Sequence, residues 1–253
     1  MRFASLSFFC LHFLKGCDPC MNQRLSCIFD LIRAGRGVID VGTDHGYLPE
    51  RLALTGYPGK IFASDLRPGP LSAAKRTAER AGVSEKIRFL LCDGLESVPP
   101  DEIDTIIVAG MGGDTICGIL DRADWCLDSA YRLLLQPMTK AEILRYWLSC
   151  NGFTIEEERL VAEGDTIYQV LAARFTGKNE TLSDLELFLG KRGCGAEEGL
   201  YRALLAQRIA SLERRIAGLR RASDTPERQA ELRRLLDALA VCNKEAEAND
   251  ACL

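Results

Sequence analysis

The chain has 253 residues, of which 47% are hydrophobic and 27% are charged, and its formal net charge is −4 at pH 7. This is an ordinary globular composition, and no apolar run reaches the roughly 20 residues of a membrane-spanning helix, so no such helix is expected. The acidic balance excludes a uniformly basic nucleic-acid-binding protein, so a role of that kind requires a local basic surface.

The first 20 residues are expected to be a non-functional extension. Arg2 and the apolar stretch 3–14 are similar to a secretory signal peptide, but no small-residue cleavage site follows them. Met21 then opens an amphipathic segment whose apolar residues are spaced i, i+3, i+4, i+7, which predicts a helix. These residues are Leu25, Ile28, Phe29 and Ile32. We therefore expect the functional chain to begin near Met21 and to be cytoplasmic.

Strand and helix patterns alternate from there to about residue 150. Strands are expected at 37–41, 60–64, 87–92, 104–109 and 131–135, and helices at 47–55, 70–81, 114–122 and 140–150. Short, continuously apolar strands that alternate with helices predict a parallel α/β sheet covered on both faces. Two more strands, 153–162 and 166–175, flank a tight turn and predict an antiparallel hairpin. This layout resembles that of Rossmann-like methyltransferases.

Beyond about residue 179 the strand patterns stop and a heptad pattern begins. Its apolar residues are Leu205, Ile209, Leu212, Ile216 and Leu219. After a break, Thr225 is suited to cap a second helix and Pro226 to open it. We therefore predict a Rossmann-like domain over 21–177 and an antiparallel helical hairpin, a coiled coil, within 178–253.

The faces of this predicted hairpin carry more arginines than acids. The arginines chosen as candidates for substrate binding are Arg214, Arg215, Arg220 and Arg221. A solvated coiled-coil face explains such charges equally well. A basic surface for a polyanion is the sharper interpretation, and the two stay open.

The turn D-V-G-T-D-H-G at 40–46 joins the first strand to the first helix. It lacks the G-x-G-x-x-G pattern of dinucleotide-binding proteins, which favours a cofactor without a diphosphate, namely S-adenosylmethionine. The cationic groups of that cofactor suit Asp40 and Asp44, although Asp40 can also cap backbone N–H groups.

Acidic residues also end the second and third strands. Asp65 is placed to accept hydrogen bonds from ribose hydroxyls, and Asp93 to reach an adenine amino group. Each acid alone also suits a turn, but ligands of open α/β sheets bind where the parallel strands end. The residues expected to bind the cofactor are Asp40, Gly42, Thr43, Asp44, Gly46, Asp65, Leu66, Asp93, Gly94, Ala109 and Gly110.

The fourth strand ends in A-G-M-G-G at 109–113. N6-adenine and N4-cytosine methyltransferases usually carry N/D-P-P-aromatic at this place, and this chain does not. The glycines predict a roomy floor lined by backbone at the start of a helix. Close packing of that helix on the sheet is the alternative interpretation.

Five motifs follow one another along the chain: D-V-G-T-D-H-G-Y-L-P (40–49), S-D-L-R-P-G-P-L (64–71), C-D-G-L (92–95), V-A-G-M-G-G (108–113) and L-Q-P (135–137). Their order and spacing resemble the bacterial tRNA (adenine(22)-N1)-methyltransferases, from about Met21 to the C-terminus. The resemblance implies a class I S-adenosylmethionine-dependent enzyme that methylates N1 of an adenine in the D-arm region of tRNA. It also implies that the coiled coil helps to hold the tRNA, whereas residues 1–20 depart from the family.

The residues fit that chemistry. N1 of adenine has a free lone pair and no proton to lose, so alignment matters more than a general base. N1 lies on the Watson–Crick edge, so the base must be unpaired or extruded. The candidates for alignment and stacking are His45, Tyr47, Met111 and Gly112, and those for phosphate contact near the site are Arg24, which can also reach the cofactor's carboxylate, and Arg67. A capping histidine, a half-buried tyrosine and solvated arginines are the ordinary alternatives.

Two rival functions stay open at this point: a methyltransferase that acts on a small molecule or a protein, and a non-catalytic coiled-coil scaffold. No metal is expected, because Cys17 and Cys20 would need further ligands and the only histidines are His12 and His45. We expect tRNA as the partner, no membrane, and a monomer.

Overall fold

The computed structural model describes residues 21–191, 198–221 and 225–250. The expected extension 1–20, with its Cys17 and Cys20, therefore lies outside the described residues. In the described part, no helix is long and apolar enough to cross a membrane. Nor do these residues gather three or more histidine, cysteine or acidic side chains into a possible metal site.

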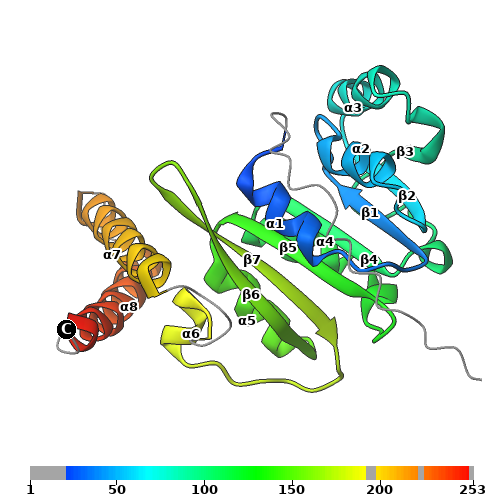
Figure 1. Cartoon of the computed structure of the whole chain (residues 1–253). Coiled ribbons are helices and arrows are strands. Elements are labelled where there is room, and N and C mark those ends of the chain that lie inside the picture. The colour runs from blue at the N-terminus through cyan, green and yellow to red at the C-terminus, as the bar shows by residue number, and fades with distance from the viewer. Residues whose placement is uncertain (1–20, 192–197, 222–224, 251–253) are drawn as a thin grey trace, which may run out of the picture.

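Seven strands of the described chain form one sheet in the order β3-β2-β1-β4-β5-β7-β6 (Figure 1). The parallel strands are β1 (Gly37–Val41), β2 (Lys60–Asp65), β3 (Ile87–Leu91), β4 (Thr105–Gly112) and β5 (Arg132–Thr139). The antiparallel strands are β6 (Phe153–Glu163) and β7 (Thr166–Phe175), with β7 paired to β5. The predicted class I sheet with a terminal hairpin is confirmed.

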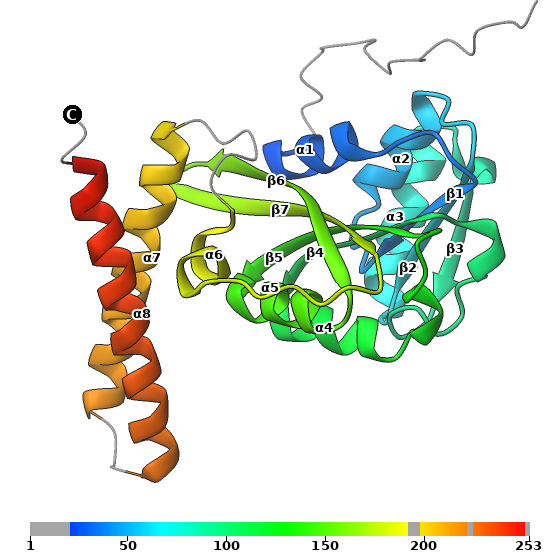
Figure 2. The same cartoon turned by 90° about the horizontal axis from the view of Figure 1, so that it is seen from below.

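Helices cover both faces of this sheet (Figure 2). They are α1 (Gln23–Leu31), α2 (Tyr47–Leu54) and α3 (Pro68–Arg80) on one face, and α4 (Gly113–Asp121) and α5 (Ala141–Cys150) on the other. Each face of the sheet has its own hydrophobic core, and neighbouring residues of one strand point into different cores. Ile106 packs in the core under α4 and α5, whereas Ile107 packs in the core under α1, α2 and α3. This two-sided burial explains why the strands are continuously apolar.

Three boundaries differ by two residues or more from those that the sequence predicts, and the others agree to within one residue. β4 runs on through Gly112 and β5 through Thr139, because the two strands stay paired past a bulge after Ala109. Helix α3 begins at Pro68, two residues before Pro70, which the sequence predicts as the first residue of the helix. A short helix, α6 (Asp184–Leu189), was not predicted. Short 3₁₀ turns lie at Ser84–Lys86, Pro100–Glu102 and Asp124–Cys126.

The C-terminal hairpin consists of α7 (Glu198–Arg221) and α8 (Pro226–Asp250), and it lies beyond β6 and β7 (Figure 2). Both helices share an apolar core that also includes Ile167 of β7. As predicted, Pro226 opens α8, and the Thr225 hydroxyl accepts a hydrogen bond from a backbone N–H of its first turn. The boundary between 177 and 178 stays a prediction.

A buried ion pair fixes α6 and α5 to the sheet. Arg145 of α5 is 1% exposed and donates to both carboxylate oxygens of Glu158 of β6, at 3.0 and 3.1 Å. Its third nitrogen donates to the carbonyl of Leu187 in α6 at 2.8 Å. The segment that leads to the hairpin is therefore held by charge as well as by apolar packing.

Candidate active site

The turn after β1 is bound to both neighbouring strands. The N–H groups of Gly42 and Thr43 donate to the carbonyl of Ser64 in β2, at 2.8 and 2.9 Å. Gly42 has a φ of 70°, and a side chain there would overlap the terminal methyl group of Met111 in β4. The positive φ favours glycine here, and the missing side chain leaves room for Met111. The sequence-predicted turn thus packs directly against the end of β4.

Asp40 is a buried acid of this turn, and its pKa is raised. Its side chain is 7% exposed, and its carboxylate accepts a 2.6 Å hydrogen bond from the Thr43 hydroxyl. Burial raises the pKa of Asp40 to about 6; the bond from Thr43 opposes the rise and the charge of Asp65 adds to it. A buried carboxyl of this kind gains from a cationic neighbour, because opposite charge favours its ionised form.

Asp65, at the end of β2, joins the turn to the start of α3. One of its carboxylate oxygens accepts the Arg67 N–H at 2.9 Å, and the other accepts the Asp44 N–H at 3.4 Å. Asp44 itself has a φ of 51°, a left-handed conformation that aspartate tolerates better than most residues. Leu66 beside it is 62% exposed, which is unusual for a large apolar residue next to a strand end.

Asp93 follows β3 and is shared with α4. Its carboxylate pairs with the guanidinium of Arg122 at 3.0 Å, and both side chains are about half exposed. Gly94 is buried, and a side chain there would press on Ile119 of α4 at 3.0 Å. The third acid therefore lies at the predicted edge of the sheet, with a cationic partner that the sequence pattern did not identify.

Of the glycines after Ala109, one lies in open space, as an open floor of the site requires, and two are needed for close packing of α4. Gly110 has a φ of 76° and is exposed, and a side chain there would meet open space. At Gly113 a side chain would overlap the carbonyl of Lys140, and at Gly112 it would come within 2.7 Å of Asp114. The predicted roomy floor is therefore at Gly110, and close packing takes over at the start of α4.

Sequence reasoning missed Gln136, the buried residue that holds this floor. Its side-chain oxygen accepts the Gly110 N–H at 3.1 Å and a guanidinium N–H of Arg24 at 2.9 Å. Its amide nitrogen donates to the Pro137 carbonyl at 3.0 Å, which fixes the amide's orientation. The detectable signal was a glutamine at the end of a buried strand, since buried amides need partners.

Arg24 reaches this network from α1. Its guanidinium pairs with Glu163 at 2.9 Å, its backbone N–H donates to the same carboxylate at 2.7 Å, and the ring of Tyr168 lies 4.7 Å away. Arg24 thus joins α1 and the β6–β7 turn to Gln136. Its expected contact with a phosphate or with the cofactor's carboxylate is untested, and the structure gives it a positioning role beside the floor.

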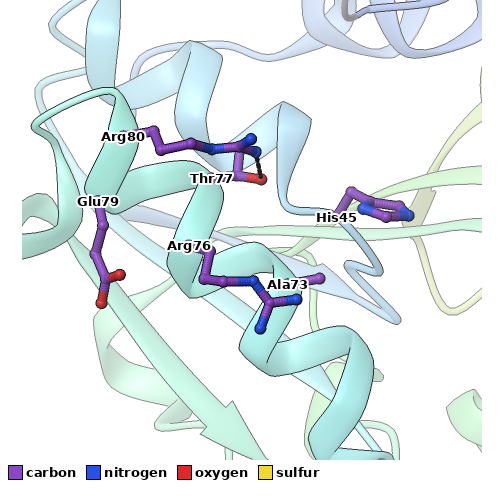
Figure 3. A pocket seen from close by; sticks show the side chains of 6 residues that line it. All are labelled: His45, Ala73, Arg76, Thr77, Glu79 and Arg80. Atoms are coloured by element: carbon purple, nitrogen blue, oxygen red, sulfur yellow. Dashed lines mark hydrogen bonds between the residues drawn. The ribbon is translucent and has the colours of Figure 1, made fainter.

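His45 and Tyr47 lie on the opposite side of the turn, toward α3. Their rings are stacked, with centroids 5.5 Å apart and planes 14° apart, and His45 is 3.7 Å from Asp44. His45 also lines a pocket of about 470 Å³ with residues of α3 (Figure 3). The four residues expected to align the base therefore fall into two groups, with Met111 and Gly112 at the end of β4.

The four candidate arginines of the hairpin are all exposed on α7. Arg215 is 3.7 Å from Glu142 and 3.4 Å from Glu231, so carboxylates already neutralise it. Within the described ranges, Arg214, Arg220 and Arg221 form no ion pair. These three side chains therefore remain candidates for binding a polyanion.

Helix α7 is fixed to the edge of the sheet where the site lies. Gln207 accepts the Ile167 N–H at 2.8 Å and donates to the Ile167 carbonyl at 3.1 Å, as a neighbouring strand would. Arg208 donates to Gln169 at 2.6 Å. β7 runs antiparallel to β5, so this first part of β7 lies toward the carboxyl end of β5, the end that carries Gln136.

Comparison with known proteins agrees with this geometry. Residues 21–171 match a family model described as a methyltransferase domain. The tRNA (adenine(22)-N(1))-methyltransferase of Bacillus subtilis is 32% identical over 170 residues, which cover 67% of this chain and 71% of the relative.

Solved structures extend the similarity through the helical hairpin. The crystal structure of the B. subtilis M1A22 tRNA methyltransferase TrmK is 28% identical with a TM-score of 0.75, over 89% of this chain and 98% of that one. A Streptococcus pneumoniae protein, Sp1610, in complex with S-adenosyl-L-methionine, is 27% identical with a TM-score of 0.70, over 89% and 99%. With the turn, the acids and the docked hairpin in place, the chain belongs to the tRNA (adenine(22)-N1)-methyltransferase family of class I S-adenosylmethionine-dependent enzymes.

Proposed function

We propose that this protein transfers a methyl group from S-adenosylmethionine to N1 of adenine 22 in tRNA. The observation that carries the proposal is the meeting of three features at one edge of the sheet: the acids that end β1, β2 and β3, the open floor at Gly110, and the docked helix α7. A methyltransferase for small molecules does not need the third feature, and a scaffold does not need the first two.

The residues present fit S-adenosylmethionine. Asp40 is a buried carboxyl with a raised pKa, which a cationic ligand stabilises. Each carboxylate oxygen of Asp65 accepts one hydrogen bond from a backbone N–H of the surrounding loops. Each oxygen therefore has a lone pair left to accept a bond from a ribose hydroxyl. Thr43 and Asp44 link the two acids, because the Thr43 hydroxyl donates to Asp40 and the Asp44 N–H donates to Asp65. Asp93 follows the next strand, where we propose that it binds the adenine of the cofactor. When bound, the cofactor supplies an electrophilic methyl group on a sulfonium.

The protein's task is then to place adenine N1 in line with that methyl group and to keep the base unpaired. Gly110 offers open space beside the turn, and Gln136 fixes its N–H, so the floor is preorganised before the base arrives. Met111 presses on Gly42 and so couples the floor to the cofactor turn. A general base is not required because N1 carries no proton, and the new positive charge spreads over the methylated ring.

Primer extension tests the proposal directly. Purified protein is incubated with unmodified tRNA and S-adenosylmethionine, and reverse transcription is then expected to stop next to adenine 22, because N1-methyladenine cannot pair. The stop must disappear without cofactor, and at a limiting cofactor concentration it must weaken in the Asp65→Ala variant. Methyl transfer to a small molecule or a protein, with no stop on tRNA, would favour the first rival function instead.

A further inference from the structure

We propose that the pocket between His45 and α3 binds the backbone phosphate and base of a tRNA nucleotide that flanks the target adenine. This inference rests on the proposed function and adds a second contact surface for tRNA, on the catalytic domain itself. The pocket has a volume of about 470 Å³ and is lined by His45, Ala73, Arg76, Thr77, Glu79 and Arg80. None of the site residues expected from the sequence, apart from His45, lies in it.

The pocket is cationic in a protein whose net charge is −4. Ala73, Arg76, Thr77 and Arg80 recur at helical spacing and so share one face of α3. In Figure 3 the Arg80 guanidinium extends toward the side where His45 lies, whereas the Glu79 carboxylate hangs down from the helix and does not extend toward His45. Among residues that the structure describes, neither Arg76 nor Arg80 is paired with a carboxylate. Both charges therefore stay available for an anion.

Part of the pocket is held in place before any ligand arrives. Thr77 is 4% exposed, and its hydroxyl accepts a 3.3 Å hydrogen bond from Arg80. At Gly46 a side chain would come within 2.8 Å of Ala74, so the cofactor turn and α3 are in close contact. The pocket wall is thus continuous with the turn that precedes α2.

The aromatic ring on the other wall, that of His45, identifies the class of ligand. His45 lines the pocket together with the two arginines, and Tyr47 stacks on its ring from outside the pocket lining, so the two rings form an aromatic platform. Aromatic rings next to cations are how proteins bind single-stranded nucleic acid, since bases stack on the rings while phosphates meet the charges. A free phosphate would use the arginines but not the platform. Extrusion of the target adenine opens the strand on either side of it, and this pocket is placed to receive a neighbour.

The test compares Arg76→Gln and Arg80→Gln with Lys75→Gln. Lys75 carries the same charge on the same helix but lies over the ring of Phe89 at 5.8 Å, on the β3 side. Each arginine variant is expected to weaken unmodified-tRNA binding about fivefold and the double variant roughly 20-fold. The dependence of log affinity on log salt is expected to lose about one unit per arginine removed. Lys75→Gln is expected to bind tRNA as the wild type does.

Calorimetry with S-adenosylmethionine separates the possible failures. The arginine variants are expected to bind the cofactor with unchanged affinity, which also shows that they are folded. Equal losses of tRNA affinity in Arg76→Gln and Lys75→Gln would overturn the inference, because diffuse charge would then explain the effect. So would unchanged tRNA binding in the double variant, or a matching loss of cofactor affinity. A wild-type protein that neither binds nor methylates tRNA would instead refute the proposed function.

Discussion

Lowering the pH through 6 is expected to weaken the binding of S-adenosylmethionine, because Asp40 then takes up a proton. Burial raises the pKa of this carboxyl from 3.8 to about 6 in the free protein. A cationic ligand favours the ionised form and so lowers the pKa in the complex. The affinity must then fall as the pH drops below the free protein's pKa.

The magnitude follows from that pKa. At pH 5, a carboxyl with a pKa of about 6 is ionised in only about a tenth of the molecules. The affinity is therefore expected to be about tenfold lower at pH 5 than at pH 7.5. Binding at pH 6 should release about half a proton, which calorimetry detects as a dependence of the heat on the buffer.

Asp40→Asn is the decisive control. This variant is expected to bind the cofactor more weakly at pH 7.5 and to lose the dependence on pH. The measurement is repeated in His45→Gln, which removes the histidine of the same turn and should keep the dependence. A wild-type affinity that stays flat between pH 7.5 and 5, or the same fall in Asp40→Asn, would refute the reasoning.

The stability of the free protein responds to the same carboxyl in the opposite direction. A folded-state pKa above the unfolded value of 3.8 means that the folded state binds the proton more tightly. The contribution of Asp40 to the free energy of unfolding is therefore fully present below about pH 4 and is lost as the pH rises through 6. It amounts to roughly 3 kcal/mol at most. Weaker cofactor binding at pH 5 would thus not reflect unfolding at this site.

Three further perturbations address the ribose contact, the buried ion pair and the hairpin. Asp65→Ala is expected to weaken cofactor binding at least tenfold in calorimetry, and unchanged affinity would contradict its role at the ribose. Arg145→Met should lower the free energy of unfolding in urea by about 3–5 kcal/mol, because it leaves the Glu158 carboxylate buried and unpaired; a change below about 1 kcal/mol would contradict that reasoning. Replacing Arg214, Arg220 and Arg221 together with glutamine should weaken tRNA binding and spare cofactor binding, and equal loss of both would make the hairpin a structural clamp.

The elements that periodicity describes were predicted closely, and those that depend on distant partners were not. Strand β1 has the predicted bounds, Gly37–Val41. Its five residues are all buried, as expected for the short apolar strand that the sequence predicts. The A-G-M-G-G run indicated a strand end at Ala109, since glycine weakens a strand. β4 nevertheless continues to Gly112 because β5 runs beside it as far as Thr139. A pairing partner more than 25 residues away decided that boundary.

The site shows the same division. Asp40 and Asp65 were predicted from their place at strand ends, and the structure has both at the carboxyl edge of the parallel sheet. The link from Arg24 to Gln136 joins residues that are 112 positions apart, and no local pattern reports such a contact. The raised pKa of Asp40 likewise depends on burial by the surrounding fold. Sequence reasoning therefore identified which residues carry charge at the edge, but not which of them are already paired.

The pairing of charges decides where each ligand can bind. The acids that suit a cationic cofactor, Asp40 and Asp65, are each 7% exposed and lie beneath the turn. The unpaired arginines lie outside it, on the outer face of α3 and on α7, where an extended polyanion can reach them. If cations and acids were mixed at one surface, each would neutralise the other, as Arg215 and Glu231 do on the hairpin. In the proposed arrangement, their separation is what lets an acidic protein hold a cationic cofactor and a polyanionic RNA at the same edge of one sheet.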